Sequence, residues 1–334
     1  MNNDIKVSVI CLVYNHEKYL RQCLEGFVNQ KTNFDFEVLV HDDASTDNSK
    51  AIIKEYEEKY PNIIKPIYQK ENQYSKGVRI IQTHLFPKAR GKYLAFCEGD
   101  DYWCNENKLQ IQYDALENNK ECSICTHKVE FIKENGELIE GCFPEEQFNS
   151  GVYSGLTLLA NMPKYYFHTT SYFLRKEDLE KYCFNNPASK LSPVGDVCIM
   201  YSMFVAGDVY YIDETLSYYR RFANGSWSVG QKKRSARNDN KSRLCDYLGA
   251  FCDQLAIRDS SKYESCIEKI RTESKRQKFW YYVDAEDYKM VCSEEYKNIF
   301  NSELNIAHKV LYKILRYSFV IKKIYAMIVD KIRK

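Results

Sequence analysis

Apolar residues in the first hundred positions form short runs that alternate with helical patterns. The chain reads VSVICLVYN over residues 7–15 and HEKYLRQCLEGFVNQ over 16–30, where Tyr19, Leu20, Cys23, Leu24 and Phe27 recur every three or four positions. The stretch FEVLVHDDASTDNSKAIIKEYEEKY over 36–60 repeats this unit as an apolar run, an acidic turn and a second helical pattern. Alternation of strands and helices predicts an α/β fold built on a parallel sheet.

Two further strands are expected at 63–69 and 92–97, and the second runs directly into acidic residues. In an open parallel sheet, ligands bind outside the carboxyl ends of the strands. Three polar clusters that follow predicted strands should therefore meet, namely Tyr14 with Asn15, Asp42 with Asp43, and Asp100 with Asp101. Paired carboxylates at such an edge suit a hard divalent cation that also binds a phosphate. The loop HDDASTDNS is equally typical of a turn that enters a helix, and this alternative stays open.

Length, net charge and missing motifs disfavour several classes of function. The chain has 334 residues, enough for about two domains, and 48 Lys and Arg against 46 Asp and Glu leave a net charge of +2. A nucleic-acid binder would carry a stronger basic excess. Neither GxGxxG nor GxxxxGK[ST] occurs, which disfavours dinucleotide and P-loop sites.

Cysteine usage and hydropathy indicate a reduced, cytoplasmic compartment. The 13 cysteines follow no disulfide spacing, and we expect neither a cleaved leader nor an apolar run long enough to span a bilayer. Cys122 and Cys125 form a CxxC, with His127 and Cys142 beyond it. A second CxxC is missing from the sequence and the segment alternates like a strand, so we expect no zinc site there.

The segments 7–30, 36–47 and 91–103 together resemble the nucleotide-sugar domain of family 2 glycosyltransferases, and the resemblance extends over roughly residues 5–225. It implies the GT-A fold, a mostly parallel, Rossmann-like sheet flanked by helices. It also implies inverting sugar transfer from a nucleoside diphosphate sugar, UDP being the commonest, with Mn²⁺ or Mg²⁺ as cofactor. By this resemblance Tyr14 stacks on the base, Asp43 binds the base edge or ribose, Asp100 and Asp101 form the DXD-like element, and Asp101 is the direct metal ligand.

The chain departs from the family pattern at several positions. Leu12 stands where the family usually has Pro, and Glu98 where Asp is common, although neither change removes a required oxygen ligand. Lys76 or Arg79 is the candidate for the cation that contacts the nucleotide, but either residue could equally be an ordinary surface cation. Phe222 follows Arg221 where a His often helps to hold the diphosphate, so Arg220 or Arg221 is expected to supply that contact.

The second half resembles the acceptor side of the family. The segment YYFHTTSYFLRKEDLEKY over 165–182 includes His168, a candidate acceptor contact that could also be a structural hydrogen-bonding residue. The segment over 191–221 resembles the acceptor loop and the helix after it, which implies that Asp196 is the catalytic base. Because Pro193 and Gly195 precede it, Asp196 could instead be a helix N-cap. One carboxylate base suffices for inversion when a cation stabilises the leaving diphosphate.

We expect three regions, namely a nucleotide-sugar half over 1–120, an acceptor half over 121–230 and a helical extension over 231–334. The end of the extension predicts a basic amphipathic helix with an apolar stripe of Leu311, Ile314, Ile321, Tyr325, Ile328 and Ile332. Such a helix suits peripheral association with the inner face of the plasma membrane, although a partner or the protein's own core could also cover it. The expected acceptor is a glycan or lipid-linked oligosaccharide of surface polysaccharide synthesis. A catalytically silent nucleotide-sugar-binding or scaffold subunit of a polysaccharide assembly complex is the alternative.

Overall fold

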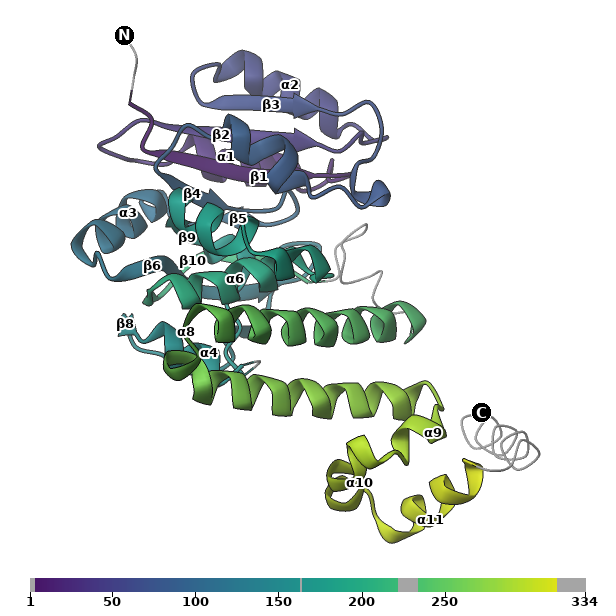
Figure 1. Cartoon of the computed structure of the whole chain (residues 1–334). Coiled ribbons are helices and arrows are strands. Elements are labelled where there is room, and N and C mark those ends of the chain that lie inside the picture. The colour runs from purple at the N-terminus through teal and green to yellow at the C-terminus, as the bar shows by residue number, and fades with distance from the viewer. Residues whose placement is uncertain (1–3, 163, 222–233, 317–334) are drawn as a thin grey trace. The chain divides into compact units, whose positions relative to one another are not determined.

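The computed structural model describes residues 4–162, 164–221 and 234–316, which belong to two compact units (Figure 1). The first unit comprises residues 1–190 and 194–232, and the second comprises 191–193 and 233–334. Each unit is described by itself.

The sheet of the first unit begins with four parallel strands in the order β3-β2-β1-β4. Their bounds are Ile64–Tyr68 (β3), Phe36–Asp42 (β2), Val7–Val13 (β1) and Tyr93–Phe96 (β4). Every residue of β2 is buried, because the strand lies between β1 and β3 and is covered on its faces. All four strands predicted from the apolar runs are confirmed, as is their parallel pairing.

Beyond β4 the sheet becomes mixed, in the order β4-β9-β6-β10-β5. Strands β6 and β10 pair in parallel, whereas β5, β7, β8 and β9 are antiparallel to their neighbours. The sheet is therefore less parallel than the sequence indicates, because short return strands replace helical crossovers in this half. The bounds are Tyr102–Trp103 (β5), Cys122–Ile132 (β6), Leu138–Phe143 (β7), Gly151–Tyr153 (β8), Phe173–Arg175 (β9) and Asp208–Arg220 (β10). Cys122 and Cys125 are buried residues of β6, as the alternating pattern predicts.

Three helices contribute to the main core of this sheet, namely α1 (Leu20–Val28), α2 (Ser49–Lys59) and α3 (Lys108–Asn118). The buried residues of α1 are Leu20, Cys23, Leu24 and Phe27, the stripe that the sequence predicts. The remaining α-helices are α4 (Gly155–Ala160), α5 (Lys176–Asp178) and α6 (Gly195–Ala206). The 3-10 helices of this unit among the described residues are η1 (Tyr74–Lys76), η3 (Phe86–Lys88), η4 (Thr169–Ser171) and η6 (Pro187–Leu191). The wider π-helical turns are η2 (Ile81–Leu85) and η5 (Leu179–Phe184).

The second unit is helical, as the sequence predicts. Helix α8 (Arg234–Asp284) breaks at Asp259, whose φ is −167° and ψ 94°, and Figure 1 shows its two segments folded back antiparallel. The elements α9 (Tyr288–Val291), η7 (Glu294–Tyr296), α10 (Lys297–Glu303) and α11 (Ile306–Leu315) follow. A separate apolar cluster of Phe279, Tyr296, Phe300 and Leu315 joins them.

The predicted amphipathic helix is described only in part. Leu311 and Ile314 lie in α11, whereas Ile321, Tyr325, Ile328 and Ile332 lie outside the described residues. Within the described ranges, no helix combines the length and the apolar character that crossing a membrane requires.

Candidate functional site

The carboxyl ends of β1, β2 and β4 meet at one edge of the sheet. The register pairs Val13 with Asp42, and the amide of Asp43 donates to the carbonyl of Val13 at 2.9 Å. The amide of Gly99, just after β4, donates to the carbonyl of Leu12 at 2.9 Å. These bonds bring the turns after the three strands together, as the rule for parallel strands predicts.

Two residues in these turns have left-handed backbone conformations. Asn15 has a φ of 58° and Ala44 a φ of 61°. Asn tolerates this region, but for Ala it costs about 1 kcal/mol. Hydrogen bonds to side chains fix the first turn. The backbone N–H of Asn15 donates to Ser45 Oγ at 3.0 Å, and the side-chain Oδ1 of Asn15 accepts from the backbone N–H of Thr46 at 2.8 Å. Non-glycine residues in this conformation at a convergence of strand ends are typical of binding sites.

The carboxylate of Asp43 anchors the segment after β3. Its two oxygens accept from the backbone amides of Gln73 at 2.7 Å and Tyr74 at 3.0 Å, and only 3% of Asp43 is exposed. Two tyrosines of the neighbouring segments are accessible, with Tyr14 40% and Tyr74 63% exposed. Asp42 is also buried, and its Oδ2 has no hydrogen-bond partner among the described residues. Gln73 and Tyr74 are site residues that sequence reasoning missed, although their position just before Lys76 was a signal.

The candidate nucleotide cations lie in the same anchored segment. Lys76 forms an ion pair with Glu71, and Arg79 donates to the carbonyl of Ser189. Both residues follow closely in sequence the two amides, of Gln73 and Tyr74, that Asp43 binds. Their contact with a nucleotide stays a prediction.

Three carboxyl groups gather after β4. Asp100 and Asp101 are 7% and 2% exposed, and Asp101 Oδ1 accepts from the backbone amide of Arg220 at 2.8 Å. Burial and the charge of Asp100 raise the pKa of Asp101 well above its ordinary value. Burial, Asp100 and Asp196 together raise the pKa of Glu98 to about 8, and Glu98 Oε2 is buried without a partner among the described residues.

The predicted base reaches this acidic group from α6. Asp196 lies inside the first turn of the helix, whose N-cap is Val194, so the N-cap alternative does not hold. Its Oδ2 accepts from the hydroxyl of Tyr166 at 2.5 Å and its Oδ1 accepts from the Val197 amide at 2.7 Å. Burial raises the pKa of Asp196, and the bond from Tyr166 opposes that shift. The segment that carries Tyr166 also reaches the acidic turn, because His168 Nδ1 lies 3.9 Å from Asp101 Oδ2 and Thr170 Oγ1 donates to Cys97 Sγ at 3.2 Å. This segment therefore brings Asp196 of α6 close to the acidic turn after β4.

His168 lies beside the acidic turn within an aromatic cluster. Its Nδ1 is 3.9 Å from Asp101 Oδ2 and accepts from the Thr170 amide at 3.3 Å. The ring centre is 4.1 Å from that of Tyr219 and 5.7 Å from that of Phe143. Burial lowers the pKa of His168 to about 3, so the imidazole is neutral at physiological pH. Its contact with an acceptor stays a prediction.

The two arginines at the end of β10 differ. Arg220 is 2% exposed and its guanidinium donates to oxygens of the protein. Arg221 is partly exposed, and its guanidinium lies 4.7 Å from the centre of the Phe131 ring. Sequence reasoning treated the two alike because adjacent arginines carry no sign of which one is buried.

The acidic turn offers part of a set of ligands for a divalent cation. Within the described part of the chain, no group of three or more His, Cys, Asp or Glu side chains is arranged to hold a metal ion. Asp100 and Asp101 provide two carboxylates, and Mg²⁺ typically takes its other ligands from phosphates and water. Burial first, and the neighbouring carboxylate of Asp100 second, raise the pKa values of Glu98 and Asp101, and a bound cation would oppose that shift. The donor set therefore fits a cation shared with a diphosphate.

Comparison with known proteins agrees with this geometry. The sequence model described as Glycosyl transferase family 2 matches residues 8–183, which is more than half of the chain. An uncharacterized protein of Mycobacterium tuberculosis is 34% identical over 221 residues, or 66% of this chain. The match spans only 60% of that relative's own length.

Two solved structures share the fold. S. aureus TarS 1–349 in complex with UDP-GlcNAc has a TM-score of 0.62 at 17% identity, over 89% of this chain and 78% of that chain. The mannosyltransferase PcManGT from Pyrobaculum calidifontis, in complex with GDP-Man and Mn²⁺, has a TM-score of 0.52 at 13% identity, over 98% of this chain and 87% of that chain. At these identities the likeness shows the fold, which is the GT-A fold expected from the sequence.

Proposed function

Because the chain belongs to glycosyl transferase family 2, we propose that it moves a sugar from a nucleoside diphosphate sugar to a glycan or lipid-linked acceptor, with inversion at the anomeric carbon. The observation that carries the proposal is that one segment contacts both Asp196 and the acidic turn, since the Tyr166 hydroxyl donates to Asp196 and His168 Nδ1 lies 3.9 Å from Asp101 Oδ2. A base is thereby next to the place where a cation and a diphosphate would be bound.

The donor would lie along the edge formed by β1, β2 and β4. Tyr14 offers an exposed ring for stacking on the base, beside the Asp43 turn. Asp100 and Asp101 would hold Mn²⁺ or Mg²⁺, which when bound neutralises charge on the leaving diphosphate. UDP-GlcNAc and GDP-Man bound to the two structural neighbours support a nucleotide-sugar donor. Arg221 is the arginine that we assign to the diphosphate.

Asp196 would act as the general base. Its carboxylate takes the proton from the acceptor hydroxyl, the acceptor oxygen bonds to the anomeric carbon, and the bond from that carbon to the diphosphate breaks with its electron pair on the diphosphate. The hydroxyl of Tyr166 fixes the orientation of the carboxylate through its 2.5 Å bond to Oδ2. The aromatic cluster of Phe143, His168 and Tyr219 offers ring faces for an acceptor sugar.

The experiment is a nucleotide-release assay with the full chain, a panel of UDP and GDP sugars, and Mn²⁺ or Mg²⁺. We expect metal-dependent release from one donor. Asp196→Asn should lower kcat by roughly 10²- to 10⁴-fold while donor binding persists. Asp101→Asn should lose metal-dependent donor binding as well.

Asp114→Asn is the matched control, because Asp114 is an exposed carboxylate of α3 that bonds only Gln110 among the contacts described. It should leave the rate unchanged. Tight donor binding without release, even with membrane extract as a source of acceptors, would contradict the transferase and favour the silent binding subunit.

We also propose that the second unit associates with an anionic membrane surface at the cytoplasmic face, where a lipid-linked acceptor would be presented. Helix α11 exposes Ile306, Val310 and Ile314, which are four residues apart and therefore lie on one face. Lys309 and Lys313 are on the same helix. An exposed apolar stripe flanked by lysines is typical of interfacial helices.

A further inference from the structure

The side chain of Arg220 connects the acidic turn to two other parts of the first unit. Its Nε donates to the carbonyl of Asp100 at 2.9 Å. One terminal nitrogen donates to the carbonyls of Lys133 and Glu134 at 3.0 and 2.8 Å, and the other to Gln22 Oε1 at 2.8 Å. The guanidinium carbon lies 4.7 Å from the centre of the Tyr19 ring. The contacts thus come from α1, from the turn after β6 and from the turn after β4.

The backbone of Arg220 also bonds to the acidic turn. Strand β10 pairs antiparallel with β5, Ser217 facing Trp103 and Tyr218 facing Tyr102, so the register places Arg220 opposite Asp100. Beyond the last ladder pair, the Arg220 amide donates to Asp101 Oδ1 at 2.8 Å. One oxygen of Asp101 is thereby fixed, and its other oxygen lies 3.9 Å from His168 Nδ1.

Burying this cation has a cost that the arrangement must offset. Its four hydrogen-bond acceptors among the described residues are all neutral oxygens, and Arg220 is 2% exposed. The face of the Tyr19 ring favours a positive charge here. Only arginine presents several N–H donors in a rigid plane, so lysine could not make the same set of bonds.

We propose that Arg220 is a positioning residue for the metal-binding turn rather than a ligand of the diphosphate. It fixes the Asp100–Asp101 peptide through the carbonyl of Asp100 and the side chain of Asp101 through its own amide. This inference rests on the proposed function, since it concerns the cation that Asp100 and Asp101 would hold. By this proposal, Arg220 holds Asp100 and Asp101 in the geometry that a hard cation requires of its ligands.

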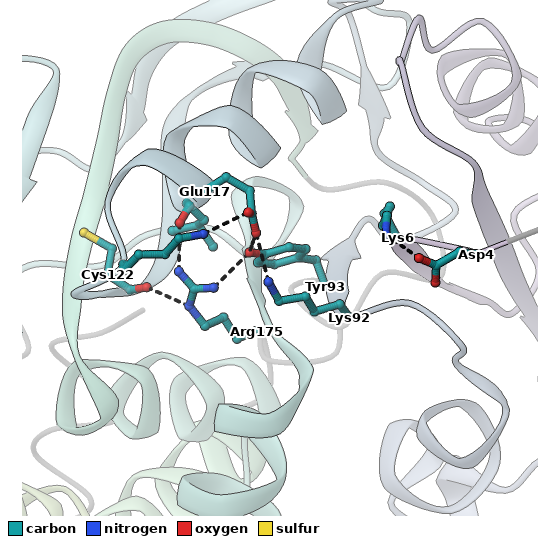
Figure 2. Close-up of polar contacts among 9 residues, drawn as sticks. Asp4, Lys6, Lys92, Tyr93, Glu117, Cys122 and Arg175 are labelled. Carbon is teal, nitrogen blue, oxygen red and sulfur yellow. Dashed lines mark hydrogen bonds and ion pairs between the residues drawn. The ribbon is translucent and has the colours of Figure 1, made fainter.

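Arg175 provides a matched control. It is also a buried arginine, 8% exposed, whose guanidinium donates to the carbonyls of Cys122 and Leu116 and to the Tyr93 hydroxyl. Figure 2 shows that Arg175 belongs to a network with Tyr93, Glu117 and Lys92, and this network includes no residue of the acidic turn. Arg175→Lys therefore removes a similar set of bonds without touching Asp100 or Asp101.

The test is calorimetric titration of the full 334-residue chain with UDP and with GDP, each with and without Mn²⁺. We expect Arg220→Lys to reduce the enhancement of nucleotide affinity by Mn²⁺ about tenfold or more while affinity without metal is unchanged. Arg175→Lys should keep the full enhancement even if it lowers the melting temperature.

The outcomes separate the hypotheses. Equal loss of affinity with and without Mn²⁺ in Arg220→Lys would show a direct diphosphate contact and overturn positioning, and unchanged enhancement would overturn it too. If the wild type binds neither nucleotide, the proposed function itself fails. Should Arg220→Lys not fold, Gln22→Leu removes one acceptor of the guanidinium, and we expect about a threefold loss of the Mn²⁺ enhancement.

Discussion

Lys108 is a lysine with no exposed surface, at the first turn of α3. Its Nζ donates to Gln112 Oε1 at 2.6 Å and lies 4.0 Å from the centre of the Trp103 ring. Gln112 in turn donates to the carbonyls of Cys125 and Ser171. Burial lowers the pKa of Lys108 from 10.5 to about 7. Lys108 and Gln112 therefore form one buried polar network, in which the lysine is only partly protonated near pH 7.

This residue predicts a pH dependence of stability. Between about pH 7 and 10.5 the unfolded chain binds a proton that the folded chain does not, so the free energy of unfolding rises with pH. The slope is at most about 1.4 kcal/mol per pH unit. Relative to Lys108→Met, the wild type should therefore gain roughly 2 kcal/mol between pH 7 and 9. Urea denaturation at a series of pH values measures it.

Lys54→Met is the control, because Lys54 is an exposed lysine of α2. Its stability difference from the wild type should not change over the same pH range. A difference between wild type and Lys108→Met that is constant from pH 7 to 9 would show that Lys108 keeps its ordinary titration.

Residues of the site differ in how far the sequence could reveal them. Asp42, Asp43, Asp100 and Asp101 follow apolar runs, and parallel strands bring such positions together without any further information. Asp196 comes close to the acidic turn, almost a hundred residues before it in sequence, through the contacts of Tyr166 and His168, and only family resemblance indicated this. The burial of Arg220 depends on the β10–β5 register, which no local pattern encodes.

At the scale of elements, long buried strands were predictable and short exposed ones were not. Strands β1 to β4 lie on apolar runs, and β6 lies on the segment of Cys122 and Cys125, whose sequence alternates like a strand. Strand β7 has several exposed residues and β8 spans only Gly151–Tyr153, so their apolar signal is weak. These short strands turn the expected parallel sheet into a mixed one, because they pair antiparallel with β6 and β10.

Gly91, just before β4, packs so closely against β1 that adding one methyl group there should lower the stability of the fold. A Cβ added at Gly91 would lie 2.6 Å from the carbonyl carbon of Val7 and closer still to the Ser8 amide nitrogen. These are backbone atoms of β1, a strand paired on both sides, and they cannot move away without breaking a ladder. Gly91→Ala should therefore cost about 1–3 kcal/mol or more, seen as a lower melting temperature.

Gly195→Ala tests whether the effect is specific. Gly195 is in the same unit, and a Cβ added there meets nothing within 4 Å. Its melting temperature should match the wild type. If Gly91→Ala melts at the same temperature as Gly195→Ala, then β1 and β4 are not packed as closely as described.

At the scale of the whole molecule, the two units carry different parts of the proposed function. Every candidate residue for donor binding and catalysis belongs to the first unit, and the family match ends at residue 183 within it. The second unit has its own apolar core and contributes the exposed stripe of α11. Membrane association should therefore be separable from donor binding by substitutions in the second unit.

Ile306 and Ile257 allow a sharp test of that separation. Both are isoleucines of the second unit, 80% and 78% exposed, but Ile306 belongs to the α11 stripe and Ile257 lies on α8. Ile306→Asp puts an acidic residue in the first turn of α11, which favours the helix, so lost binding would not reflect a lost helix.

We expect the 334-residue chain to sediment with vesicles that contain anionic phosphatidylglycerol and not with neutral phosphatidylcholine vesicles. Burial of one isoleucine contributes about 1.5–3 kcal/mol, so Ile306→Asp should weaken vesicle binding roughly tenfold or more. Ile257→Asp should bind like the wild type, and both variants should keep the donor affinity of the first unit. Equal weakening in the two variants would show a general charge effect, and unchanged binding by Ile306→Asp would place the contact elsewhere in the chain.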